Sequence, residues 1–197
     1  MLKLSLFLCA AVVTTGCSSI SSKNVPGISA ELISDSDYYA IVDQQTLRDE
    51  RYDGLTNVLT LSATLLSTEL SLAQVDHNAR IYQYNESQYQ NERGTIKSNL
   101  AKQTEMFVSL FVPDKKQDDL AKKNSMWRIF LDIAGQRYEA KVTKIKTQAA
   151  SLHDLYPEYN RWSTPYRLVF NVPTIMCDTG HPKLIVTSPV TSSTLGF

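Results

Sequence analysis

The sequence predicts a mainly β fold with one long helix, in the α+β class. Several short segments alternate apolar and polar residues, as half-buried strands do. One stretch of about 35 residues instead repeats its apolar residues at spacings of three and four, as an amphipathic helix does. About six strands at hairpin-scale spacing are typical of an antiparallel, immunoglobulin-like β-sandwich, and the helix would be an insertion in it.

The composition supports a single globular domain over residues 28–197. Of the 197 residues, 43% are hydrophobic and 20% are charged, which is enough apolar material for a sizeable core. Twenty Lys and Arg balance twenty Asp and Glu, so the formal charge is zero and no field would attract nucleic acid. Three cysteines are too few for a disulfide scaffold.

Residues 1–16 have the pattern of a secretory signal peptide. Lys3 precedes an apolar run over residues 4–13, and small residues end in Gly16 immediately before Cys17. An apolar run of this length rises about 15 Å as a helix, roughly half the hydrocarbon core of a bilayer, so it is too short to span a membrane.

The Gly16-Cys17 junction resembles the lipobox of bacterial lipoproteins, although Thr14 stands where that family usually has Leu. The resemblance implies cleavage before Cys17, a diacylglyceryl group on its sulfur and often a palmitate-like acyl chain on its amino group. Ser18, in place of the Asp that retains enteric lipoproteins at the inner membrane, implies an outer-membrane anchor facing the periplasm or the cell surface. Two or three acyl chains anchor stably where one does not. An ordinary cleaved signal followed by a chance cysteine is the alternative.

The first part of the mature chain is expected to hold few strands. Residues 17–27 are rich in serine and end in Pro-Gly, which is typical of a tether. Residues 28–56 are mixed and predict a short helix or two, closed by a turn at Tyr52-Asp53-Gly54. Residues 57–66 alternate Leu59, Leu61, Ala63 and Leu65 with more polar residues and predict a strand, with the start of a helix as the alternative.

Residues 68–102 predict one long amphipathic helix. Its stripe follows spacings of three and four through Leu72, Val75, Ala79, Tyr82, Glu86, Tyr89, Arg93, Ile96 and Leu100. Such a helix would be about 50 Å long, so a bend or break at Gly94 is expected. Either both halves pack on the protein's own sheet, or one half projects toward a partner.

Residues 105–197 are expected to be rich in strands. Residues 106–112 are apolar on both faces apart from Ser109 and predict a central, covered strand. Residues 127–133 and 138–142 alternate around Ala134-Gly135 and predict a β-hairpin. Further strands are expected over residues 166–172 and 184–186.

No catalytic, metal or cofactor motif stands out. His77 lies at a polar register of the predicted helix and is expected to be solvated. Cys177 and His181 could serve a metal site or a nucleophile–base pair, but a tight turn with a buried, inert Cys177 is the simpler interpretation. Asp35-Ser36-Asp37 begins like a calcium loop and lacks the later Gly and Glu. Phosphate-binding and serine-hydrolase motifs do not occur.

Aromatic residues are dense over residues 156–162. Tyr156, Tyr159 and Trp162 are the aromatic residues expected to be exposed, and together they suggest a surface for a glycan or a peptide.

These observations favour a non-enzymatic, lipid-anchored envelope protein. It would be attached through acyl chains on Cys17 and would act by contact with an envelope protein. The alternative is a glycan- or peptide-binding module that uses the aromatic loop. A hydrolase built on Cys177 and His181 is a third, weaker hypothesis.

Overall fold

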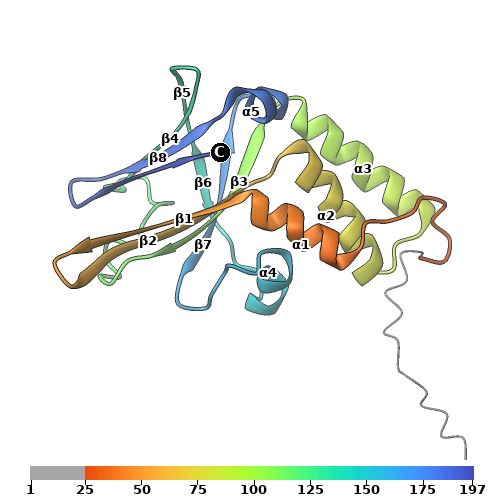
Figure 1. Cartoon of the computed structure of the whole chain (residues 1–197), viewed down its shortest axis with the longest axis horizontal. Helices are drawn as coiled ribbons and strands as arrows, with labels where there is room; N and C mark the ends of the chain where they lie inside the picture. The colour runs from red at the N-terminus through yellow and green to blue at the C-terminus, as the bar shows by residue number, and fades with distance from the viewer. Residues whose placement is uncertain (1–24) are drawn as a thin grey trace, which may run out of the picture.

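A computed structural model describes residues 25–197 and confirms the α+β class. The described part of the chain contains five helices (Figure 1): α1 (Asp35–Gln44), α2 (Thr68–Ile81), α3 (Glu86–Leu100), α4 (Ala149–Leu155) and α5 (Thr174–Gly180). The predicted signal peptide, Cys17 and most of the predicted tether lie outside the described residues.

Nine strands over the same residues form two antiparallel sheets. The strands are β1 (Thr46–Asp53), β2 (Thr56–Leu65), β3 (Thr104–Phe111), β4 (Arg128–Ile133), β5 (Gln136–Glu139), β6 (Lys141–Lys144), β7 (Thr164–Phe170), β8 (Lys183–Thr187) and β9 (Ser192–Gly196). One sheet has the order β1-β2-β3-β7-β6, and the other has the order β5-β4-β8-β9. The immunoglobulin-like class of sandwich stays a prediction.

The two sheets share one hydrophobic core, and α1, α2 and α3 lie together at one end of the molecule (Figure 1). The alternating residues of β2 confirm the predicted strand, because Leu59, Leu61 and Ala63 are all fully buried in this core. β3 and β7 supply residues from the same sheet, and β4 and β8 supply residues from the other. Alternation along each strand therefore aims one face of each sheet at the other.

The predicted hairpin after Trp127 is present, but its return strand is divided between the sheets. Ala134 and Gly135 both have positive φ, 50° and 86°, which fits the twist of a two-residue hairpin turn. β5 pairs with β4, and the Ala140 N–H still donates to the Ile129 carbonyl. From Lys141 onward the chain pairs with β7 instead. The single return strand predicted over residues 138–142 is therefore wrong, because the chain crosses from one sheet to the other at Ala140.

The single helix predicted over residues 68–102 is also wrong. It is two antiparallel helices, and the break lies at residues 82–85 rather than at Gly94, which sits inside α3. Gln83 has a φ of 51°, in the left-handed region that ends a helix. Asn85 then starts α3 with a capping box, in which its side chain accepts from the Gln88 N–H and the Gln88 side chain accepts from the Asn85 N–H. The fold back allows Tyr89 of α3 to pack on Val75 and Ala79 of α2.

The segment before β2 contains the predicted helix and a strand that was not predicted. α1 begins at the Ser34 cap, whose side chain accepts from the Asp37 N–H. β1 follows and pairs with β2 along its whole length, and Gly54 at φ 59° lies in the predicted turn between them. Mostly exposed residues make up β1, which explains why it lacks a strand's apolar alternation.

The described end of the predicted tether belongs to the fold. Val25 is only 5% exposed and packs with Ile28 and Leu32 on α2 and α3. Within residues 25–197, every helix is too short or too polar to cross a membrane.

The capping box at the start of α3 predicts a loss of stability when Asn85 is replaced. Asn85→Ala should lower the free energy of unfolding by about 1 kcal/mol, because the Gln88 N–H in the first turn of α3 loses its side-chain acceptor. Ser87→Ala, an exposed change in the same turn, is the matched control and should have little effect. Urea unfolding of both variants measures the difference, and equal stabilities would contradict this role of Asn85.

Candidate functional site

A pocket of about 480 Å³ lies on the outer face of the five-stranded sheet. Its walls come from α2, the end of α3, the β6 end of the sheet, and α4 with the residue that follows it. The lining residues are Leu66, Ser71, Gln74, Ile96, Asn99, Leu100, Gln103, Glu105, residues 143–147, Leu152, Leu155, Tyr156 and Arg167. This volume falls within the range of small-ligand pockets.

The sheet face under the pocket needs a cover, because β3 carries the apolar side chain of Phe107 on this face. Phe107 points away from the main core and is 4% exposed. Tyr156 stacks on it with the ring centroids 3.8 Å apart and the planes 1° from parallel, and Tyr159 meets it edge-on at 6.1 Å. These contacts hold the segment after α4 against the sheet.

The structure therefore separates the three aromatic residues predicted as a ligand surface. Tyr156 and Tyr159 are each 8% exposed, so the expectation that they are exposed is wrong. Trp162 is 67% exposed, with the Arg161 guanidinium carbon 4.8 Å from the ring centroid. Tyr156 lines the pocket from inside, whereas Trp162 is not among the lining residues.

The pocket combines an apolar lining with polar groups. Leu66, Leu100 and Leu152 contribute apolar surface. The Gln74 side-chain amide donates to the Tyr156 hydroxyl at 3.0 Å, and Arg167 lies 3.8 Å from Glu105. Such a lining suits recognition of an amphipathic ligand, with a few polar groups fixing its orientation.

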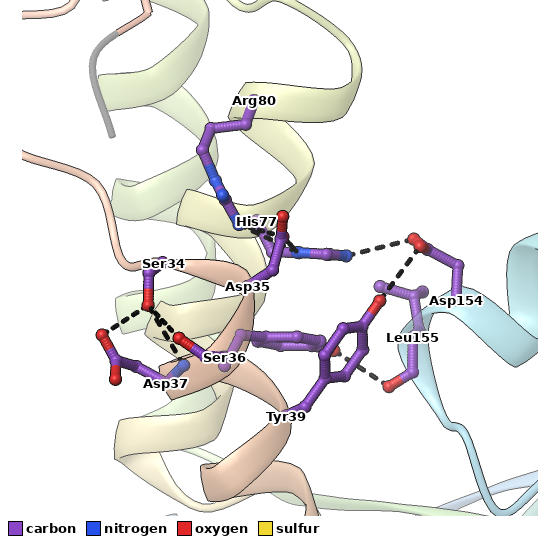
Figure 2. Close-up of polar contacts among 10 residues, drawn as sticks. Ser34, Asp35, Ser36, Asp37, Tyr39, His77, Arg80, Asp154 and Leu155 are labelled. Atoms are coloured by element: carbon purple, nitrogen blue, oxygen red, sulfur yellow. Dashed lines mark hydrogen bonds and ion pairs between the residues drawn. The ribbon is translucent and has the colours of Figure 1, made fainter. Parts of the chain in front are cut away.

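A buried histidine lies behind the wall formed by α4 (Figure 2). The side chain of His77 is only 2% exposed. Its ring lies parallel to Tyr38, with centroids 4.2 Å apart. Its Nε2 is 3.1 Å from Asp154 Oδ2. The expectation that His77 is solvated is wrong, because α1 covers the side of α2 on which it lies.

His77 has polar partners at both ring nitrogens. Nδ1 is 3.2 Å from Asp35 Oδ1 and 3.2 Å from a guanidinium nitrogen of Arg80. A neutral ring can donate from Nε2 to Asp154 and accept from Arg80 at Nδ1. A protonated ring can donate to both carboxylates. Either protonation state therefore satisfies the buried ring.

Two tyrosines of α1 complete the connection between the helices. The Tyr38 hydroxyl donates to the Leu155 carbonyl at 2.9 Å, and the Tyr39 hydroxyl donates to Asp154 at 3.4 Å. Burial raises the pKa of the Tyr38 hydroxyl well above its ordinary value, so it stays a donor. The contacts around the His77 ring thus connect α1, α2 and α4. α4 also forms a wall of the pocket.

This cluster resembles a catalytic base with its orienting carboxylate, but its geometry serves a different purpose. A general base needs a ring nitrogen within reach of the substrate. Both nitrogens of His77 face protein side chains, and the ring is enclosed between helices. The arrangement positions α4 and leaves no ring nitrogen open to a substrate.

The Cys177–His181 pair does not form an activated nucleophile either. Cys177 lies in α5, is 3% exposed as expected, and has its sulfur 3.3 Å from the Thr104 hydroxyl. Burial raises the pKa of its thiol, which disfavours the reactive thiolate. His181 is exposed at the end of α5, with a φ of 47°.

The carboxylates of the Asp35-Ser36-Asp37 segment serve the start of α1. Asp37 donates its N–H to Ser34 and accepts from the Ser34 hydroxyl, while Asp35 faces Arg80 and His77. In the described residues, no group of three His, Cys, Asp or Glu side chains is arranged to hold a metal ion.

No protein-family profile matches the chain. No curated protein matches it either. A solved crystal structure of a novel protein of unknown function from Burkholderia pseudomallei K96243 is similar with a TM-score of 0.41 and 12% identity, over 82% of each chain.

The His77 cluster predicts a local as well as a global effect of mutation. His77→Ala should lower the free energy of unfolding by about 2–4 kcal/mol, because it leaves a cavity beside the Tyr38 ring and removes the hydrogen bond to Asp154. Amide hydrogen exchange in α4 should rise more than exchange in the sheets. His153→Ala, at an exposed histidine of α4 itself, is the matched control. If amide exchange in α4 were unchanged in the His77→Ala variant, the role of His77 in holding α4 in place would be contradicted.

The buried tyrosines predict that alkaline pH destabilises the protein. Burial raises the pKa of Tyr156 to about 12, above the ordinary value near 10 that it regains on unfolding. Its contribution is therefore complete below about pH 10 and is lost as pH rises toward 12, by up to about 1.4 kcal/mol per pH unit.

Urea unfolding between about pH 8 and pH 11.5 measures this slope. Tyr156→Phe should reduce this slope, leaving the part due to other buried tyrosines such as Tyr38, and should also cost about 1 kcal/mol at neutral pH because the bond from Gln74 is lost. Tyr82→Phe changes an exposed ring and should leave the slope as it is. A slope that Tyr156→Phe does not alter would contradict the prediction.

Proposed function

We propose that the protein is a lipid-anchored envelope protein that binds a partner protein in the pocket beside α4 and catalyses no reaction. The observation that carries this proposal is the pocket itself, whose lining mixes leucines with Gln74, Glu105 and Arg167. A peptide segment has the same mixture of apolar side chains and hydrogen-bonding groups. The peptide-binding alternative uses the same surface, because Tyr156 of the aromatic segment lines it.

Two features support a binding role over a catalytic one. The histidine with the best carboxylate partners is enclosed, and its ring nitrogens are engaged with Asp35, Arg80 and Asp154. The thiol of Cys177 is buried, with a raised pKa. The pocket is lined instead by amides, hydroxyl groups, lysines, an ion pair and aliphatic groups, which suit recognition.

The predicted anchor would hold this pocket close to a membrane. The lipobox-like Gly16-Cys17 pair and Ser18 support acyl chains at the outer membrane, facing the periplasm or the cell surface. Eight residues after Cys17 the chain reaches Val25, which is packed on α2 and α3. Eight residues reach at most about 28 Å when extended. A partner in the same membrane, or close to it, would be within reach.

Site-specific photo-crosslinking in living cells tests the proposal. A photoreactive amino acid at Asn99 or Lys146, both exposed and both lining the pocket, should capture the same partner. The control positions are Ser192 and Thr194, exposed on β9 of the other sheet, and they should not capture it. Cys17→Ala should release the protein from the membrane and weaken the cross-link.

Two results would contradict the proposal. Cross-links from Ser192 and Thr194 without cross-links from the pocket would place the contact on the other sheet. If the Cys17→Ala variant stayed bound to the membrane, the predicted lipid anchor would be contradicted.

A further inference from the structure

The edge of the five-stranded sheet runs along the pocket. β6 is the last strand in the order β1-β2-β3-β7-β6, and β7 is its only strand neighbour in the described part of the chain. The chain from Thr143 through Thr147 lines the pocket. A ligand in the pocket would therefore lie beside main-chain groups as well as side chains.

The pairing of β6 with β7 shows which main-chain groups point outward. The Ile145 N–H donates to the Pro165 carbonyl at 2.9 Å. Hydrogen-bonded pairs alternate along antiparallel strands, so Thr143 also faces β7. Val142 and Lys144 then direct their N–H and C=O groups away from β7. An extended chain could pair with these groups and continue the sheet.

The charges beside this edge are mainly positive. Lys141, Lys144 and Lys146 are all exposed, and the last two line the pocket. Arg167 on β7 adds a positive charge, which Glu105 on β3 opposes at 3.8 Å. The protein as a whole has a formal charge of zero, so this excess is local. It is complementary to an acidic ligand.

We propose that an acidic, extended segment of the partner adds to β6 as a further strand of the sheet and lies along the pocket. Its main chain would pair with Val142 and Lys144. Its acidic side chains would lie near Lys144 and Lys146, and its apolar side chains would enter the leucine-lined part of the pocket. This inference rests on the proposed function and names the class of ligand.

Lysines on an edge strand also protect proteins against edge-to-edge aggregation. A purely protective edge and a recognition edge differ in one measurable respect. A recognition edge binds an acidic peptide more tightly than a basic one, and this binding depends on main-chain pairing. A purely protective edge shows neither property.

The probe is a fluorescein-labelled synthetic peptide, Glu-Val-Glu-Leu-Glu-Val, titrated with the full-length protein and followed by anisotropy. The matched peptides carry lysine in place of glutamate, or N-methyl groups on two consecutive central residues. N-methylation keeps the charges and removes N–H groups on both edges of the peptide strand. We expect the basic peptide not to bind and the N-methylated peptide to bind at least about tenfold more weakly.

Protein variants and amide exchange locate the contact. Lys144→Glu should weaken binding of the acidic peptide about tenfold, because an attraction becomes a repulsion. The control Lys183→Glu, at an exposed lysine on β8 of the other sheet, should leave binding unchanged. By NMR, the peptide should slow amide exchange at Val142 and Lys144, and should leave Thr143 and Ile145 unchanged because they already face β7.

Failure of this inference can be told apart from failure of the proposed function. Equal binding of the parent and N-methylated peptides, or no binding of the acidic peptide, would overturn strand addition even if Asn99 and Lys146 still cross-link a partner. Binding that Lys144→Glu does not weaken would overturn the assignment to β6. Peptide binding with the expected pattern supports the inference, even if the cellular cross-links contradict the proposed function.

Discussion

The presence of large apolar side chains on both faces of β3 is the constraint on which the rest of the structure depends. Met106, Val108 and Leu110 point into the core shared by the two sheets, and each is fully buried. Phe107 points the other way, and burying such a side chain is worth about 1.5–3 kcal/mol. The fold therefore needs a second cover on the outer face. α4 and the segment after it provide that cover through the stack of Tyr156 on Phe107.

The helices at one end of the molecule depend on this cover in turn. α4 is only seven residues long, too short to be stable by itself. It is held on one side by the sheet and on the other by His77 and Tyr38, which reach Asp154 and Leu155. The pocket is the part of the outer face that α2, α3 and α4 leave uncovered. The contacts of His77 and Tyr38 with α4 therefore influence the shape of the pocket, although they lie outside it.

The parts of the fold that were predictable from the sequence are those that local patterns determine. Alternation along β2 and the Ala134-Gly135 turn depend on neighbouring residues, and both are present in the structure. The break between α2 and α3 also had a local signal, since Asn85 and Gln88 form a capping box three residues apart. The apolar stripe continues through that signal. The break predicted at Gly94 is therefore wrong, because the chain folds back at residues 82–85.

The candidate site was less predictable, because its partners are distant in the sequence. Asp154 is 77 residues from His77, and the Tyr156 hydroxyl meets Gln74 across 82 residues. The stripe through Val75 and Ala79 describes one buried side of α2, whereas α1 buries a second side on which His77 lies. One apolar stripe in the sequence does not indicate that a helix is buried on a second side as well. Composition alone likewise could not separate Tyr156, which covers the sheet, from the exposed Trp162.

The two polar regions of the structure differ in where their hydrogen-bonding capacity is used. Around His77, the ring nitrogens and the Tyr38 hydroxyl are satisfied within the protein, so this cluster stabilises one arrangement of the helices. Along β6, the main-chain groups of Val142 and Lys144 point away from β7, and the lysines beside them are exposed. Groups that are already satisfied gain little from a ligand, whereas solvated groups beside an apolar pocket can exchange water for a partner. We therefore propose that recognition occurs at the sheet edge, beside the α4 wall whose position depends on the buried histidine.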